Sequence, residues 1–299
     1  MIEHSSSDTI ILRITNSHYF FKYLRKYRVS SCYVSNFTII HKLIRKISSA
    51  FNMPCKFIFG DWKFKVREVK RFIIFDYGYD KLITRYIKNI NPNCVIHFFA
   101  FNTMSDSDIV GIKNDTNIDY IWSFDTKNVD EYGLRYASPM FTINLYEEPN
   151  NVPNKEVVFL GAAKNREIMI SNIQNEIQKI GVATNFHVIK DSKDYIEYDD
   201  YLEMIRKSSC ILDITKEGQT GLTLRFMEAL FLSKKIITNN VAVMSFPFYN
   251  SQNIFIIGVD PIDNLKGFLE SDYRPIGNDI LTYYDFDSWV QRFIEAENV

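Results

Sequence analysis

Residues 210–240 read CILDITKEGQTGLTLRFMEALFLSKKIITNN and indicate a strand, a loop, a helix and a second strand. The largely apolar, partly β-branched run 210–215 predicts a buried strand. The polar loop 216–220 contains Gly218, and a helix over 221–232 and a strand over 235–238 follow. This order forms a right-handed crossover between parallel strands. Ligands of open α/β sheets bind beyond the carboxyl ends of such strands.

The expected helix is apolar nearly all round, yet it contains Arg225 and Glu228. A helix of this kind is buried, and buried charges need a partner or a ligand. Because residues three apart are neighbours on a helix, the two side chains would be able to pair with each other. Alternatively, both face a charged, hydroxyl-rich ligand, because arginine suits phosphate and glutamate accepts hydrogen bonds from sugar hydroxyls.

The same stretch resembles the second-domain signature of bacterial capsule, lipopolysaccharide and exopolysaccharide glycosyltransferases of the two-Rossmann (GT-B) type. The resemblance is carried by GLTLRFMEALFLSKKIITNN and, further on, by Phe248, Tyr249, Asn250, Asn253 and Ile254. It implies that Glu228 contacts the ribose of the donor nucleotide. Retaining members usually carry another glutamate eight residues earlier, where this chain has Thr220. Inversion and retention therefore both stay open.

The resemblance extends over both halves, roughly from Phe72 to the end of the chain. HFFAFN, residues 97–102, ends a predicted strand at Asn102, and WSFDTKNVDEYGLRYASPMF, residues 122–141, has Asp125 after another. Asp76 follows a third predicted strand, 72–75. We expect these three side chains to face the acceptor. If the enzyme inverts, an aspartate deprotonates the acceptor hydroxyl; our preferred base is Asp125, which is also placed to cap a helix over 126–132.

The second half opens with a candidate phosphate site. A predicted strand, 156–160, runs into GAAKNR, residues 161–166, and then into a helix that ends at residue 180. A glycine after a strand, with a base at the start of the next helix, is a phosphate-binding layout. Arg166 is the candidate for the donor diphosphate; the alternative is a surface arginine. The complete expected donor site consists of Gly161, Arg166, Gln219, Thr223, Arg225 and Glu228.

Residues 146–155, YEEPNNVPNK, combine prolines, asparagines and acids and predict a linker. We place the domain boundary near Asn150. This gives an acceptor-side Rossmann-like domain over residues 1–150 and a nucleotide-sugar-binding one over 151–299. The resemblance implies two α/β domains that face a cleft, with a final helix over 283–299 that crosses back to the first domain.

Two stretches near the start of the chain, 18–28 and 37–51, mix apolar residues with bases and predict amphipathic helices with basic polar faces. In one interpretation each helix packs on the sheet and its basic face is solvated. In the other, the helices dock on an anionic bilayer, to which each base contributes ~1 kcal/mol. The second interpretation would suit a lipid-linked acceptor and a peripheral contact with the membrane.

Composition limits the class of protein. The 299 residues suffice for two domains, and a net charge of −1 gives no overall signal for nucleic acid. The absence of a C-x-x-C pattern predicts buried, reduced thiols at Cys32, Cys55, Cys94 and Cys210. His97, inside an apolar strand, is predicted to be a core residue. With no signal-peptide pattern and no long apolar run, we expect a cytoplasmic protein, at the inner face of the cell membrane if the basic helices dock.

The expected function is transfer of a hexose-like sugar from a nucleotide-sugar, taken to be UDP-linked, to a growing capsule, lipopolysaccharide or exopolysaccharide. No cofactor beyond this substrate and no metal ligands are expected, because two-Rossmann enzymes commonly neutralise the leaving diphosphate with bases and helix N-termini. The alternatives are a nucleotide-sugar epimerase or hydrolase, a polyol-phosphate transferase, or a non-catalytic sugar-nucleotide-binding partner of an assembly complex. Release of nucleoside diphosphate that depends on an acceptor distinguishes transfer from these.

Overall fold

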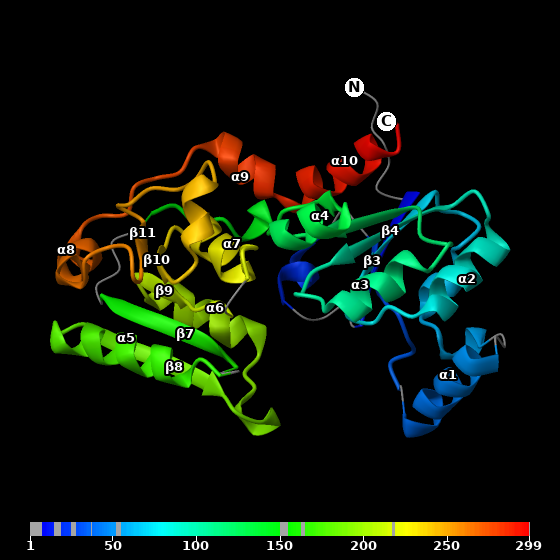
Figure 1. Ribbon diagram of the computed structural model, residues 1–299, viewed down its shortest axis with the longest axis horizontal. Coiled ribbons are helices and arrows are strands. Elements are labelled where there is room, and N and C mark those ends of the chain that lie inside the picture. The colour runs from blue at the N-terminus through cyan, green and yellow to red at the C-terminus, as the bar shows by residue number, and fades with distance from the viewer. Residues whose placement is uncertain are drawn as a thin grey trace. The chain divides into compact units, whose positions relative to one another are not determined.

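The computed structural model describes residues 8–14, 19–24, 28–36, 38–51, 55–149, 155–162, 165–216 and 219–298. The chain divides into two compact units, Met1–Ala137 and Ser138–Val299. Each unit contains one parallel β-sheet whose strands alternate with helices along the chain (Figure 1). The expectation of two Rossmann-like α/β domains is therefore confirmed.

The first sheet has the strand order β2-β1-β3-β4-β5-β6. Its strands are β1 Thr9–Arg13, β2 Arg28–Ser31, β3 Arg71–Phe75, β4 Val95–Ala100, β5 Tyr120–Ser123 and β6 Arg135–Tyr136. The helices of this unit are α1 Ile39–Phe51, α2 Lys81–Ile90, α3 Asp106–Lys113 and α4 Thr126–Tyr132. β3 is buried throughout, as expected for a parallel strand covered on both faces. The strand order reverses between β1 and β3, which is where such sheets bind ligands.

The second sheet has the order β11-β10-β9-β7-β8. Its strands are β7 Glu156–Ala162, β8 Ala183–Ile189, β9 Cys210–Asp213, β10 Lys235–Thr238 and β11 Ile254–Ile256. The helices are α5 Glu167–Lys179, α6 Tyr198–Lys207, α7 Leu224–Phe231, α8 Leu265–Glu270, α9 Asn278–Tyr284 and α10 Phe286–Ala296. Here the order reverses between β7 and β9, so the corresponding ligand position lies beside the ends of these two strands.

The strand–loop–helix–strand unit predicted for residues 210–240 is confirmed as β9, α7 and β10, but the helix begins at Leu224 rather than at residue 221. Thr223 has an extended backbone at the N-cap position. Its hydroxyl donates a hydrogen bond of 2.9 Å to Asp213, which holds the preceding loop to the end of β9. Gly218 lies outside the described residues.

Two predictions near the start of the first unit are wrong. The predicted helix 18–28 is, where described, a short 3₁₀ turn, Tyr19–Tyr23, followed by the edge strand β2. Phe20 and Phe21 are buried in this turn, with ring centroids 4.4 Å apart. The apolar run at 56–59 predicts a strand, but these residues form another 3₁₀ turn, Lys56–Ile58, closed by a hydrogen bond from the Ile58 N–H to the Cys55 carbonyl.

The division between the units falls after Ala137, whereas the linker-like composition placed it near Asn150. Residues 138–149 belong with the second unit because they bond to its last helices. The Trp289 indole N–H donates to the Ser138 carbonyl (3.0 Å), and the Phe141 N–H donates to the Tyr284 carbonyl (3.0 Å). The helix predicted over 283–299 is found as α10 but begins only at Phe286, because extended Asp285 caps it and separates it from α9, to which Tyr283 and Tyr284 belong.

Two predictions about the core are confirmed. His97 is fully buried, its Nδ1 accepts a hydrogen bond of 3.1 Å from the Trp122 indole, and its ring stacks on Tyr120. It is therefore a core residue. The thiols are buried and form no disulfide at Cys32, Cys55, Cys94 and Cys210.

Candidate functional site

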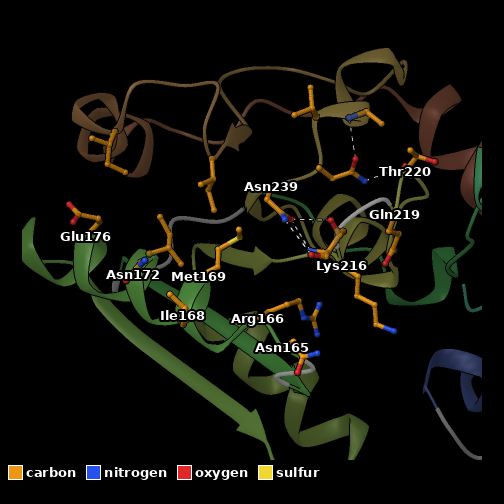
Figure 2. A pocket seen from close by; sticks show the side chains of 17 residues that line it. Asn165, Arg166, Ile168, Met169, Asn172, Glu176, Lys216, Gln219, Thr220 and Asn239 are labelled. Atoms are coloured by element: carbon orange, nitrogen blue, oxygen red, sulfur yellow. Dashed lines mark hydrogen bonds between the residues drawn. The ribbon is translucent and has the colours of Figure 1, made fainter.

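A pocket of about 930 Å³ lies at the carboxyl ends of the strands of the second sheet (Figure 2). Thr215 and Lys216 enter it from the loop after β9, Asn239 from the loop after β10, and Arg166 from the start of α5. It therefore occupies the edge at which the strand order reverses between β7 and β9. Its position and size are those of small-molecule sites in doubly wound α/β domains.

Apolar and polar side chains line the pocket together, both on α5 and on the loops that follow the strands. Ile168 and Met169 lie on α5, and Ile168 is 78% exposed even though its side chain is large and apolar. Figure 2 shows Lys216, Gln219 and Asn239 on the other side of the pocket. Apolar side chains opposite amide groups suit a flat heterocycle, which needs one surface to pack on and hydrogen-bonding partners at its edge.

The wall of the pocket that Asn239 and Asn240 line is preformed by hydrogen bonds between the two strand-end loops. The Asn239 side-chain oxygen accepts from the backbone N–H and the hydroxyl of Thr215, at 2.8 and 3.0 Å. The Asn240 amide donates to the Thr220 carbonyl at 3.3 Å. These bonds join the ends of β9 and β10. The wall is therefore already ordered before a ligand binds, which lowers the entropic cost of binding.

Arg166 stands at the N-terminal end of α5, on the rim of the pocket. Asn165 adopts the left-handed conformation (φ 68°), which asparagine tolerates better than most residues. The Arg166 guanidinium donates to the Ala162 and Ile214 carbonyls, the ends of β7 and β9. Burial, and then the charge of Arg225, lower the pKa of Arg166. Its cation and the start of a thirteen-residue helix together provide a positive site for an anion.

Arg225 does not line the pocket. Its guanidinium donates to the Leu160 carbonyl (2.6 Å) and forms an ion pair with the fully buried Asp213 (3.1 Å). Gly161 is required for this arrangement, because an added Cβ would lie 2.4 Å from the Arg225 Nη2 atom. Asp213 also accepts from the Thr223 hydroxyl. Of the expected donor site, only Arg166 and Gln219 line the pocket.

Glu228 is buried between two tyrosines of α6. The Tyr198 and Tyr201 hydroxyls donate to its two carboxylate oxygens, at 2.8 and 3.2 Å. Burial raises the pKa of Glu228 to about 7, while the Tyr198 bond and the charge of Arg225 act in the opposite direction. Arg225 pairs with Asp213 rather than with Glu228, so the intrahelical pair considered from the sequence is not the arrangement found here.

In the first unit, Asp76 and Asn102 are in contact beyond the ends of β3 and β4. The Asn102 side-chain amide donates to Asp76 at 2.9 Å, and the Phe101 and Asn102 backbone N–H groups donate at 3.2 and 3.1 Å. Burial raises the pKa of Asp76, while these hydrogen bonds oppose that rise. Asp125 is only 3% exposed and caps α4, since its carboxylate accepts from the Lys127 N–H at 3.0 Å.

Arg13 was not identified from the sequence, although it ends β1 beside the point where the order of the first sheet reverses. It is 5% exposed, and its guanidinium carbon lies 3.7 Å from the centroid of the Phe21 ring and 5.3 Å from that of Phe75. Burial lowers its pKa to about 10, against the opposing charge of Asp76. The sequence feature that could have identified Arg13 is its position as the last residue of the apolar strand TIILR, residues 9–13.

The described residues contain neither a cluster of metal ligands nor a membrane-spanning helix. No group of three or more histidine, cysteine, aspartate or glutamate side chains is arranged to hold a metal ion in that part of the chain. Over the same residues, no helix has both the length and the apolar character needed to cross a bilayer.

Comparison with known proteins finds similarity in structure but not in sequence. No protein-family model matches the chain, and no curated protein matches it in sequence. Its structure is similar to that of a sucrose-phosphate synthase from Thermosynechococcus elongatus, with a TM-score of 0.54 and 8% identity over 97% of this chain and 98% of that one. An NAD⁺-bound 3-phosphoglycerate dehydrogenase from Entamoeba histolytica has a TM-score of only 0.22, with 11% identity over 87% of this chain and 91% of that one. The first similarity shows that the two-domain α/β fold is shared.

Proposed function

We propose that the chain is a glycosyltransferase that moves a sugar from a nucleotide-sugar to a growing surface polysaccharide. The observation that carries this proposal is the pocket where the second sheet reverses its strand order, with Arg166 and the start of α5 at its rim. The fold shared with a sucrose-phosphate synthase supports the same class of reaction. The resemblance of residues 221–240 to capsule and lipopolysaccharide enzymes supports a surface glycan as the product.

We assign the donor diphosphate to Arg166 and the N-terminus of α5, and the base to the space between Ile168 and Asn239. The donor is taken to be UDP-linked. Charge that develops on the leaving diphosphate would be stabilised by Arg166, by Lys216 and by the helix N-terminus, all in place before the reaction begins. Gln219 is positioned to contact the donor directly, as one of the pocket-lining residues.

Four expected donor residues receive a supporting role in this proposal. Gly161 leaves room for Arg225, whose guanidinium ties the end of β7 to Asp213 on β9. Thr223 bonds to the same carboxylate, and Glu228 ties α7 to α6. These contacts fix the strand ends from which the pocket is built, so losing one would displace Arg166 and weaken donor binding indirectly.

For an inverting reaction we assign the base to Asp76, oriented by Asn102. Its carboxylate would take the proton of the acceptor hydroxyl as that oxygen bonds to the anomeric carbon and the bond from this carbon to the diphosphate breaks. Asp76 is half-buried and its pKa is raised. Both properties suit a general base, whereas the carboxylate of Asp125 is enclosed and caps a helix. Asp125 remains the alternative that our sequence analysis preferred.

The test is donor turnover by the full chain. A panel of nucleotide-sugars is first screened by thermal shift, because a ligand at ~100 times its dissociation constant adds ~2.7 kcal/mol of stability. The stabilising donors are then incubated with and without lipid-linked glycan acceptors. The proposal requires release of nucleoside diphosphate that depends on the acceptor. Release without acceptor would indicate hydrolysis or epimerisation, and binding without any turnover would indicate a non-catalytic partner of an assembly complex.

A further inference from the structure

The helix α1 turns large apolar side chains away from the protein. Ile39, Ile40, Leu43 and Ile47 are 82%, 69%, 58% and 44% exposed. The helix predicted for 37–51 is therefore confirmed from Ile39 onward, with Phe37 outside the described residues. However, its apolar face does not pack on the sheet. A surface helix normally buries such a stripe, so this one is available to a partner.

The opposite face of α1 is the one that holds the helix to the unit. Ile44 packs against the core, and Ser48 is buried. Arg45 lies 3.7 Å from the Asp80 carboxylate and donates to the Tyr33 hydroxyl at 3.3 Å. These contacts fix the rotation of the helix about its axis. At 3.6 residues per turn, the exposed apolar side chains then fall within one continuous arc of about 100°.

Charge identifies the kind of partner. Lys42 and Lys46 are exposed and flank the apolar arc on one side, and the sequence of α1, IIHKLIRKISSAF, contains no acidic residue. An apolar arc beside lysines is the pattern of helices that lie in a bilayer interface, where the lysine stems follow the apolar surface and their ammonium groups reach anionic headgroups. Two copies that met through this face would instead bring their lysines together.

We propose that α1 docks the protein on an anionic lipid bilayer. Ile39, Leu43 and Ile47 enter the boundary between headgroups and acyl chains, while Lys42 and Lys46 contact the headgroups. The proposal concerns the first unit alone and does not depend on the reaction catalysed. If the acceptor is lipid-linked, docking would also confine the enzyme to the surface that carries its substrate.

The test is co-sedimentation of the full chain with vesicles of phosphatidylglycerol and phosphatidylcholine, compared with phosphatidylcholine alone. We expect binding to the mixed vesicles that weakens as salt is added. Lys42→Gln with Lys46→Gln should weaken it about 25-fold, because each base near the surface contributes about fivefold. Ile39→Ser with Leu43→Ser should weaken it roughly 100-fold, at about tenfold for each apolar side chain withdrawn from the lipid.

A matched control removes two exposed lysines of the other unit, Lys207→Gln with Lys266→Gln, and should leave vesicle binding unchanged. All the substituted side chains are exposed, so melting temperatures should stay close to that of the wild type. Equal binding to neutral vesicles, no binding at low salt, or full binding by the serine variant would overturn the proposal. So would a concentration-dependent dimer that Ile39→Ser with Leu43→Ser abolishes while vesicles are not bound.

Discussion

Asp213 is a buried carboxylate that joins β9 to the start of α7 in the interior of the second unit. It is fully buried at the end of β9, and it accepts from Arg225 and from Thr223. Neither partner is its sequence neighbour: Arg225 reaches it from α7 and is held in turn by the Leu160 carbonyl of β7. The sequence indicated that Arg225 was a buried charge in need of a partner. It did not indicate that the partner was an aspartate on a strand twelve residues earlier.

The close approach of Gly161 to Arg225 predicts a coupling that can be measured. Gly161→Ala should lower the free energy of unfolding by about 1–3 kcal/mol, because the added methyl group displaces the guanidinium. In an Arg225→Met background the same substitution should cost much less. Urea unfolding of the two single variants and the double variant gives the coupling. Additive effects would show that Gly161 does not serve to accommodate Arg225.

The raised pKa of Glu228 predicts a pH dependence of stability. The carboxyl of Glu228 titrates near 7 in the fold and near 4.5 when unfolded, so between these values the folded chain binds more protons. Its contribution to stability is therefore complete below about pH 4.5 and is lost as the pH rises through about 7, at ~1.4 kcal/mol per unit of pKa shift.

Urea unfolding at pH 5 and at pH 7.5 tests this for the wild type and for Glu228→Gln. The stability of the wild type relative to the variant should fall by roughly 2–4 kcal/mol between the two pH values. If the difference in stability between the wild type and Glu228→Gln is constant or rises with pH, the carboxylate is ionised throughout and its burial does not set its pKa.

At the scale of elements, prediction succeeded where a clear local signal marks the element. β10 and α4 match their predicted bounds, because an apolar run and an N-cap mark them unambiguously. Residues 18–28 have alternating aromatic and basic side chains that fit a helix, but burial of Phe20 and Phe21 and pairing of β2 with β1 decide the structure. The strand-end positions of the candidate sites were predictable from the order of elements, whereas side-chain partners such as Tyr198 were not.

Because Asp125 caps α4, substitutions at this position can distinguish its structural role from a catalytic one. Asp125→Asn should leave stability nearly unchanged, because asparagine caps as well as aspartate, and Asp125→Ala should cost about 1 kcal/mol. On our assignment the asparagine variant keeps turnover near that of the wild type, while Asp76→Asn lowers it ~100-fold or more. Steady-state kinetics and melting curves of the three variants show which aspartate is the base. The reverse pattern of turnover would return the role of base to Asp125.

For the whole molecule, the same arrangement occurs twice. Each unit has a parallel sheet whose order reverses after its first strand, and each places its candidate side chains beyond the carboxyl edge. The first unit brings together Asp76 and Asn102, close to the charge of Arg13, and the second forms a pocket beside Arg166. We propose on this difference in chemistry that the first unit binds the acceptor and the second the donor, which is the basis of the proposed transfer.

The central claim is that a nucleoside diphosphate binds in the pocket of the second unit, and calorimetric titration of UDP into the full chain tests it most directly. Arg166→Met should weaken binding about 10- to 150-fold, since a hydrogen bond to a charged group contributes ~1.5–3 kcal/mol. Lys207→Met, which replaces an exposed lysine at the end of α6 that does not line the pocket, is the control and should bind as the wild type does. Equal affinity of the wild type and Arg166→Met, with both variants folded, would contradict the account.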